Sequence, residues 1–216
     1  MTDLLLTGPA DAAVHIILAH GAGAPMDTPF MAFFAEALAA RGHHVVRFEF
    51  PYMARRRSEG TRRPPDREPV LLEIWRAVIA EVRARFAPAT LVIGGKSMGG
   101  RMASLIAAEE GAGEQRVDGL VVLGYPFHAA GKPGYAERRL GHLPGLAVPT
   151  LICQGTRDTL GGRDTVADIP LSPAITLHWL EDGDHSLKPR KASGRTEAQN
   201  LAEAAEAIDA FVRGLP

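Results

Sequence analysis

Short apolar runs alternate along this chain with segments in which apolar residues recur at helical spacing. The runs cover residues 14–19, 44–50, 90–94, 117–123, 150–154 and 175–180. The apolar helical faces lie within residues 30–38, 71–82, 102–106 and 201–211. Strands that are apolar throughout, with amphipathic helices between them, fit a mostly parallel sheet that has helices on both faces. The pattern predicts an α/β fold.

The length and composition fit one soluble domain. The 216 residues are 46% hydrophobic and 23% charged, and the formal net charge of -1 gives no argument for binding nucleic acid or a membrane surface. No apolar stretch approaches the ~20 residues of a membrane span, and the N-terminus lacks the basic start of a signal peptide. The one cysteine, Cys153, lies in an apolar run and is expected to be a buried structural thiol. We therefore expect residues 1–216 to form a single cytoplasmic domain without membrane association.

A glycine-rich segment follows the apolar run that ends at Gly94. Residues 95–100 read Gly-Lys-Ser-Met-Gly-Gly, and a helical pattern begins directly after them. This is G-x-S-x-G between a strand and a helix, where the serine occupies a sharp turn that lifts its oxygen above the sheet. Side chains two positions on either side of Ser97 would collide with the neighbouring strand and helix. We predict that Ser97 is a nucleophile and that the Met98 N–H points toward a developing oxyanion.

Two other glycine motifs compete with this interpretation. A phosphate-binding P-loop that ends at Ser97 would need glycine at position 90, which is Thr90 inside the strand. A dinucleotide fingerprint that begins at Gly21 would need glycine at position 26, which is Met26. Neither motif is complete, so both are disfavoured. When Ser97 is considered without the other motifs, the alternative interpretation is that this segment is only a structural glycine-rich turn between a strand and a helix.

A histidine and an aspartate lie directly after two other predicted strands, where open α/β sheets place their ligand sites. They are His185, in a polar turn, and Asp158. A neutral imidazole takes a serine proton near its pKa of ~6.5, and a carboxylate fixes the imidazole tautomer. The chain order Ser97, Asp158, His185 is the order of an α/β-hydrolase triad. Asp164, six residues beyond Asp158, is the rival acid.

The first strong predicted strand ends in His20-Gly21-Ala22-Gly23, whose small residues let a backbone approach a substrate closely. A second oxyanion donor is expected in a loop at this place, and one such donor is worth ~10²–10³ in rate. We expect the Ala22 N–H to serve, with Gly23 as the alternative. His20 is expected to brace the loop rather than to transfer protons.

Taken together, these motifs resemble the compact dienelactone-hydrolase-like α/β-hydrolase family of bacteria, whose relatives include a hydrolase-like domain in a eukaryotic chromatin-complex subunit. The resemblance rests on residues 20–23, 48–53, 95–100, 124–128, 154–158 and 184–186, and it spans nearly the whole chain. It implies an α/β-hydrolase fold and carries the triad roles to Ser97, Asp158 and His185. Dienelactone hydrolases have cysteine where this chain has Ser97, so their lactone substrate does not follow.

Two segments are candidates for substrate contacts. The segment 55–69 mixes arginines with prolines and is predicted to be a loop. Its Arg62 and Arg63 are interpreted either as an anion-attracting rim or as a solvated surface whose stems cover apolar atoms. Tyr125, Phe127 and His128 follow another strand and are expected either to line the pocket or to pack a proline-bounded loop.

The sequence favours a serine hydrolase, a carboxylesterase or thioesterase, that cleaves a small soluble ester or thioester through an acyl-Ser97 intermediate. No long insertion is available for a large lid, and no metal or cofactor is expected because no cluster has metal-ligand spacing. Peptide-bond cleavage uses the same residue types and stays open. A non-catalytic binding module on the same fold is the alternative function. Nucleic-acid binding through the arginines would need a broad basic face, which the net charge does not suggest.

Overall fold

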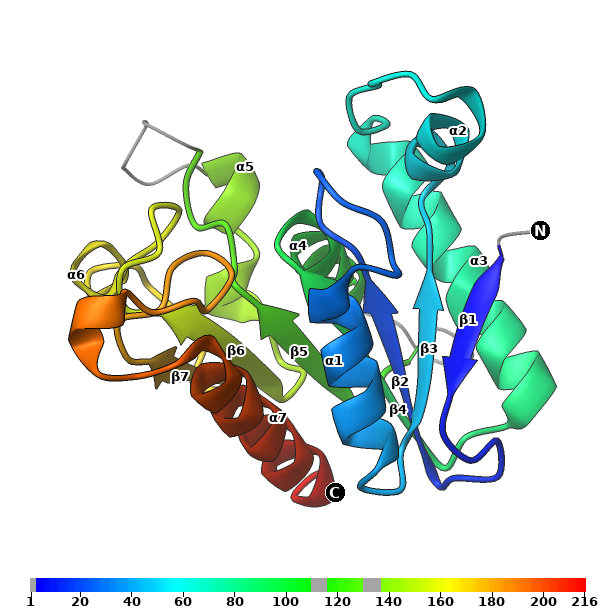
Figure 1. Cartoon of the computed structure of the whole chain (residues 1–216). Helices are drawn as coiled ribbons and strands as arrows, with labels where there is room; N and C mark the ends of the chain where they lie inside the picture. The colour runs from blue at the N-terminus through cyan, green and yellow to red at the C-terminus, as the bar shows by residue number, and fades with distance from the viewer. Residues whose placement is uncertain (1–2, 110–115, 130–136) are drawn as a thin grey trace.

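The computed structural model of the chain describes residues 3–109, 116–129 and 137–216. A seven-stranded sheet runs through the molecule in the order β1-β3-β2-β4-β5-β6-β7 (Figure 1). Every neighbouring pair is parallel except β1 and β3, which are antiparallel. The strands are β1 (Leu4–Thr7), β2 (Val14–Ala19), β3 (His44–Phe48), β4 (Thr90–Lys96), β5 (Gly119–Leu123), β6 (Thr150–Gly155) and β7 (Ile175–Leu180).

Helices cover both faces of the sheet (Figure 1). On one face lie α1 (Pro29–Ala39) and α7 (Glu197–Arg213), which contact each other; on the other lie α3 (Glu68–Phe86) and α4 (Met98–Ala108). The shorter helical elements are α2 (Pro51–Glu59), α5 (Glu137–Leu140), η1 (Leu143–Gly145), α6 (Arg163–Val166) and η2 (Lys191–Ser193). The predicted α/β fold is confirmed.

Two hydrophobic cores, one on each face, explain why the central strands are apolar throughout. In β2, Ile17 packs in the core that contains Trp75 of α3, while Ile16 and Leu18 pack in the core that contains Phe34 of α1. Successive side chains of a strand point to opposite faces, so both sets must be apolar when both faces are covered. Because helices pack on both faces of the sheet, the carboxyl ends of its strands are held in place, and the polar residues that follow them start from fixed positions.

The segment 55–69 is only partly the loop that the sequence predicts. Residues 51–59 form α2, because Pro51 suits the first helical position and the next two residues, Tyr52 and Met53, are buried anchors. The helix ends at Gly60, whose φ of 66° is the left-handed conformation that glycine adopts readily. The polar, arginine-rich composition describes the exposed face of this helix and the segment 60–67 that follows it.

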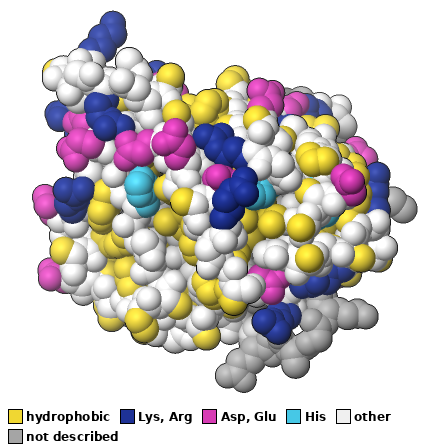
Figure 2. Space-filling model, turned by 90° about the horizontal axis from the view of Figure 1, so that it is seen from below, with side chains coloured by type: hydrophobic (Ala, Val, Ile, Leu, Met, Phe, Trp, Pro, Cys, Tyr) yellow, Lys and Arg dark blue, Asp and Glu magenta, His cyan; other side chains and the backbone are white. Residues whose placement is uncertain are grey.

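Other features of the sequence have clear places in the fold. Cys153 is fully buried in β6, as expected, and burial raises the pKa of its thiol to about 12. None of the helices in the described ranges is both long and apolar enough to cross a membrane. On the face at the amino ends of the parallel strands, acidic and basic side chains lie next to each other (Figure 2). This face therefore presents no wide area of one charge sign.

Candidate active site

The turn between β4 and α4 places Ser97 above the carboxyl edge of the sheet. Ser97 has a φ of 51° and a ψ of -115°, an unusual conformation for a residue with a side chain. A Cβ on Gly95 would lie 2.1 Å from the Ala19 carbonyl oxygen, and one on Gly99 would lie 2.5 Å from the His20 carbonyl oxygen. The sharp turn therefore depends on both glycines, for the steric reason that the sequence analysis gives.

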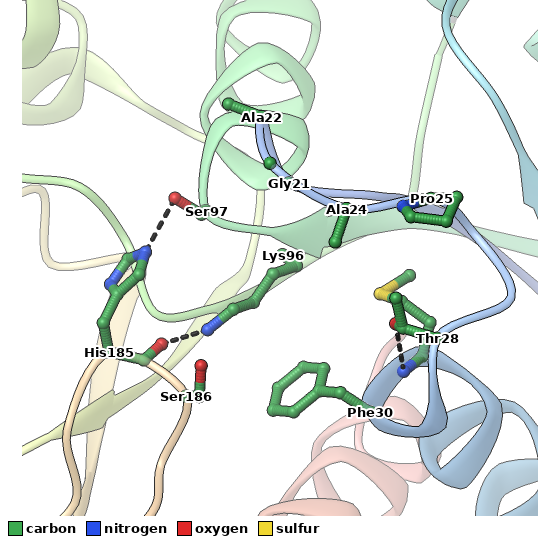
Figure 3. Close-up of a pocket in the computed structure, with 12 residues that line it drawn as sticks. Gly21, Ala22, Ala24, Pro25, Thr28, Phe30, Lys96, Ser97, His185 and Ser186 are labelled. Carbon is green, nitrogen blue, oxygen red and sulfur yellow. Dashed lines mark hydrogen bonds between the residues drawn. The ribbon is translucent and has the colours of Figure 1, made fainter. Parts of the chain in front are cut away.

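Ser97, His185 and Asp158 come together in one hydrogen-bonded chain. His185 Nε2 lies 2.8 Å from Ser97 Oγ (Figure 3), and His185 Nδ1 lies 2.8 Å from Asp158 Oδ2. Because a carboxylate accepts at Nδ1, the neutral ring carries its proton there and leaves Nε2 free to accept the Ser97 proton. The rival acid Asp164 lies in α6 and is exposed, so Asp158 alone of the two reaches the imidazole.

The Asp158 carboxylate is held by groups that the sequence analysis does not single out. Its exposed fraction is 3%, and it accepts hydrogen bonds from the Leu160 N–H and from Gln154 Nε2, both at 2.8 Å. Gln154 is fully buried near the end of β6 and also pairs with both main-chain polar groups of Tyr125. A buried amide at the end of an otherwise apolar strand is the signal in the sequence that marks Gln154.

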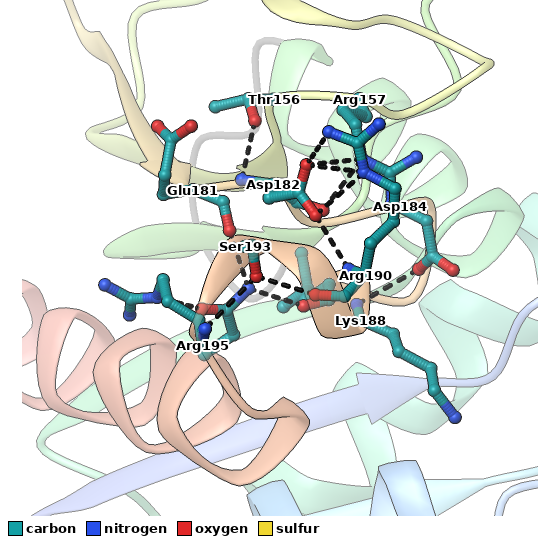
Figure 4. Close-up of polar contacts among 11 residues, drawn as sticks. Thr156, Arg157, Glu181, Asp182, Asp184, Lys188, Arg190, Ser193 and Arg195 are labelled. Carbon is teal, nitrogen blue, oxygen red and sulfur yellow. Dashed lines mark hydrogen bonds and ion pairs between the residues drawn. The ribbon is translucent and has the colours of Figure 1, made fainter.

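The loop that carries His185 is fastened at both ends (Figure 4). Asp182, buried and in the left-handed region with a φ of 53°, accepts from Arg190 Nε at 2.9 Å and from the Arg190 N–H at 2.7 Å. The hydrogen bonds from Arg190 lower the pKa of Asp182 to about 2. From α7, Asn200 Nδ2 donates to the carbonyls of Glu181 and Leu187, at 3.1 and 2.8 Å. These contacts on both sides of residue 185 restrict where its ring can lie.

The loop after β2 lines the pocket beside Ser97 with Gly21, Ala22 and Gly23. The Tyr52 hydroxyl donates to the Ala22 carbonyl at 3.0 Å, which holds this loop from behind. His20 is fully buried; its Nε2 accepts from the Phe50 N–H at 3.1 Å, so Nδ1–H donates to the Gly21 carbonyl at 2.7 Å. Burial lowers the pKa of His20 and keeps the ring neutral. The expectation that His20 braces this loop is confirmed.

The Met98 amide is the other candidate donor. Met98 is the first residue of α4, and the amide of a first helical residue has no acceptor within its own helix. The macrodipole of α4 adds partial positive charge at this end. The Met98 N–H and an N–H of the loop after β2 therefore stay the two predicted oxyanion donors.

A pocket of about 390 Å³ opens beside Ser97 and His185. Small and apolar residues make up most of its wall, together with one lysine; it is lined by Gly21, Ala22, Gly23, Ala24, Pro25, Thr28, Phe30, Met31, Lys96, Ser97, His185 and Ser186. Ala22 and Gly23 are thus in place at the pocket. Nowhere in the described residues do three or more His, Cys, Asp or Glu side chains gather as a metal site would need.

The predicted pocket residues after β5 lie elsewhere. Tyr125 and Phe127 have exposed fractions of 0% and pack in the core, with ring centroids 4.8 Å apart, so the prediction that they contact substrate is wrong. The chain turns inward after β5 because Gln154 binds the Tyr125 main chain. His128 is nearly buried and lines a separate hollow beside Asp158.

The two arginines proposed as a rim are also absent from the pocket wall. Arg62 and Arg63 lie on the exposed segment after α2, and Arg63 pairs with Glu59 at 2.6 Å. An anion-attracting role for them stays a prediction. Two arginines of α2 have acidic partners: Arg55 binds Asp66, and Arg57 binds Asp27 and Glu49.

The sheet order, the serine turn between β4 and α4, and the histidine loop between β7 and α7 define the α/β-hydrolase class. The chain belongs to the family described as "Alpha/beta hydrolase domain", whose pattern matches residues 12–213. Within the described ranges the fold has no large lid, and no inserted helix lines the pocket.

Solved structures show the same fold at low sequence identity. An α/β serine hydrolase homologue from Coxiella burnetii is 20% identical, with a TM-score of 0.71, over 100% of this chain and 92% of that one. An α/β serine hydrolase without a lid from Xanthomonas campestris is 22% identical, with a TM-score of 0.71, over 100% of this chain and 91% of that one. Dienelactone hydrolase from Anabaena variabilis is 18% identical, with a TM-score of 0.74, over 99% of this chain and 92% of that one.

Proposed function

We propose that this chain is a serine hydrolase that cleaves a small soluble ester or thioester through an acyl-Ser97 intermediate. The observation that carries the proposal is the unbroken chain from Asp158 through His185 to Ser97, with both contacts to the imidazole at 2.8 Å. A nucleophile, a base and an orienting acid at hydrogen-bond distance are what acyl transfer needs.

In the first half of the reaction, Ser97 Oγ attacks the acyl carbon while His185 Nε2 takes the hydroxyl proton. The C=O π electrons move to the oxygen, where the Met98 and Ala22 N–H groups donate to the negative charge. Asp158 stabilises the imidazolium that forms and stays ionised. The carbonyl then re-forms, the bond to the leaving oxygen or sulfur breaks, and His185 returns the proton to that atom.

In the second half, water takes the place of the leaving group. His185 Nε2 removes one water proton as the water oxygen attacks the acyl-Ser97 carbon. When the tetrahedral centre collapses, the bond to Oγ breaks, and Ser97 recovers its proton from His185. The products are a carboxylic acid and free enzyme, and no electron is transferred to an external acceptor.

The pocket supports a small substrate. Its volume of about 390 Å³ suits a short or medium acyl group, and its wall is formed mainly by alanine, proline, phenylalanine and methionine side chains. Ester and thioester substrates differ only in the leaving atom, which His185 protonates in either case. We propose that residues 1–216 act together as one catalytic domain.

The test is labelling by a fluorophosphonate probe, which forms a covalent bond only with an activated serine. We expect the wild type to be labelled, and Ser97→Ala and His185→Ala to lose labelling. Ser58→Ala is a matched control, because Ser58 is exposed and its hydroxyl donates only to the Arg55 carbonyl. It should be labelled as fast as the wild type.

The alternative function is a non-catalytic binding module on the same fold. It predicts folded wild-type protein that stays unlabelled from pH 6 to 9. Labelling of Ser97→Ala at the wild-type rate would also contradict the proposed nucleophile, because another residue would then carry the probe. Mass spectrometry of the labelled peptide distinguishes these outcomes.

A further inference from the structure

Lys96 contacts the proposed catalytic base directly. It is the last residue of β4 and precedes Ser97, and its side chain crosses the floor of the pocket toward the histidine loop (Figure 3). Its Nζ donates a hydrogen bond to the main-chain carbonyl of His185 and lies 4.7 Å from the centre of the Phe30 ring. The ammonium is therefore held by one carbonyl and one aromatic face.

No carboxylate pairs with Lys96 among the residues that the structure describes. Asp158 is bonded to His185, and Asp184 accepts from the N–H groups of Ser186 and Lys188. Both carboxylates favour the charged lysine from a distance, but burial outweighs them and lowers the pKa of Lys96 to about 8. Burying the Lys96 ammonium costs free energy, and no ion pair within the described part of the chain offsets that cost. A buried lysine here is therefore not explained by neutralisation of a carboxylate, which leaves the role of its hydrogen bond to His185 to be explained.

We propose that Lys96 is a positioning residue that fixes His185 for catalysis through its backbone. Lys96 and Ser97 are consecutive, and they hold the same histidine at two points: Ser97 Oγ contacts the ring Nε2, and Lys96 Nζ binds the main-chain oxygen. A third contact comes from Asp158 at Nδ1. The base is thus tied to the strand end that carries the nucleophile. The inference rests on the proposed function and adds a role that the triad does not include.

The proposed role of Lys96 predicts that activity falls as the pH rises. A hydrogen bond from a charged donor is roughly twice as strong as one from a neutral donor. Because the pKa of Lys96 is about 8, the ammonium loses its proton as the pH rises through 8, and the hold on His185 weakens. We expect the wild-type kcat to fall above that pH, although a neutral histidine alone would stay active there.

The experiment compares Lys96→Met, which removes the charge but keeps the chain length, with Lys96→Arg, which keeps the charge at every accessible pH. Kinetics with 4-nitrophenyl butyrate are measured from pH 6 to 9.5, together with the rate of fluorophosphonate labelling. We expect Lys96→Met to lower kcat by about 10- to 100-fold, with KM within about twofold, because small misplacements of a catalytic group cost this much. In Lys96→Arg the fall above pH 8 should disappear. Lys188→Met is the control, because Lys188 is on the same loop but exposed and paired with Glu197.

Three results overturn the inference. The first is a Lys96→Met protein whose kcat and labelling rate equal the wild type across the pH range. The second is an effect confined to KM for a carboxylate-bearing ester such as mono-4-nitrophenyl glutarate, because the ammonium would then contact substrate. The third is a wild-type kcat that stays level from pH 8 to 9.5, a measurement that needs no variant to fold. Wild-type protein without labelling overturns the proposed function itself, and this inference with it.

Discussion

At the scale of single residues, the contact between Asp158 and His185 fixes the tautomer of the proposed catalytic base. Replacing Asp158 by asparagine keeps the shape but presents an amide to a ring nitrogen that must donate its proton. The ring then favours the wrong tautomer, and Nε2 no longer accepts the Ser97 proton. We expect kcat to fall by about 10³- to 10⁴-fold with little change in KM, measured on an activated ester.

The matched control for this prediction is Asp164→Asn. Asp164 is the other acid that follows β6, and it is exposed in α6, so its loss should change kcat less than about twofold. The reverse result, an active Asp158→Asn protein and an inactive Asp164→Asn protein, contradicts the assignment of the acid. Thermal unfolding of both proteins checks that activity is lost without loss of fold.

Residues that act behind the site are the hardest to predict from sequence. The sequence predicts Ser97, His185 and Asp158 because each directly follows a strand in the expected order. Gln154 holds Asp158 from inside β6. An amide in an apolar run marks the residue, but its partners cannot be predicted because its hydrogen bonds join segments that only the fold brings together. Phe127 shows the opposite error, since an aromatic residue after a strand fits a pocket wall and a buried core equally well.

At the scale of elements, the turn from β4 into α4 fixes the position of Ser97, the proposed nucleophile. Gly99 lies in the first turn of α4, where a Cβ would stand 2.5 Å from the His20 carbonyl oxygen and 2.6 Å from that of Ala19. Backbone atoms cannot give way as a side chain can. We expect Gly99→Ala to lower the free energy of unfolding by about 3 kcal/mol or more, measured by urea denaturation.

Gly145→Ala is the control for this prediction. A Cβ on Gly145 meets nothing within 4 Å, so this substitution should change the free energy of unfolding by less than about 0.5 kcal/mol. A Gly99→Ala protein as stable as the wild type would show that β2 and α4 can separate without cost. The requirement for glycine at this turn would then have another cause.

The elements that sequence patterns miss are those with weak hydrophobic signals. Strand β1 has only four residues, none of them fully buried, because it is an edge strand. Helix α2 is masked by its arginines, since only two of its residues, Tyr52 and Met53, are buried. By contrast, β2 to β7 are predicted to within two residues at each end. The central strands β2, β4, β5 and β6 are covered on both faces and therefore read as apolar runs.

At the scale of the whole molecule, buried neutral histidines link stability to pH. Burial lowers the pKa of His15, which packs against His44 with the ring centroids 4.8 Å apart at the amino ends of β2 and β3. Burial also lowers the pKa of His20, at the start of the loop after β2. At His142, which is partly buried and contacts Ser104 of α4, desolvation lowers the pKa to about 4. These rings are spread across the fold, so their protonation destabilises the molecule as a whole.

The sign of the effect follows from proton uptake. In the unfolded chain these histidines bind protons below pH ~6.5, whereas in the folded protein they stay neutral to lower pH. Stability is therefore complete above pH ~6.5 and falls as the pH drops toward 4; His142 alone accounts for at most about 3 kcal/mol of this loss. Asp182 affects stability in a different pH range. Because its pKa in the folded protein is about 2, its contribution to the free energy of unfolding is lost only below pH ~4.

Urea denaturation of the wild type and of His142→Gln at pH 7.5, 6.5, 5.5 and 4.5 tests this prediction. We expect the wild-type free energy of unfolding to decrease steadily below pH 6.5. His142→Gln should show a shallower decrease, because glutamine keeps a donor toward Ser104 Oγ, 2.8 Å from His142 Nε2, without binding a proton. Equal slopes for the two proteins would assign the loss to the other histidines, and a level wild-type curve would contradict the neutral state of all three.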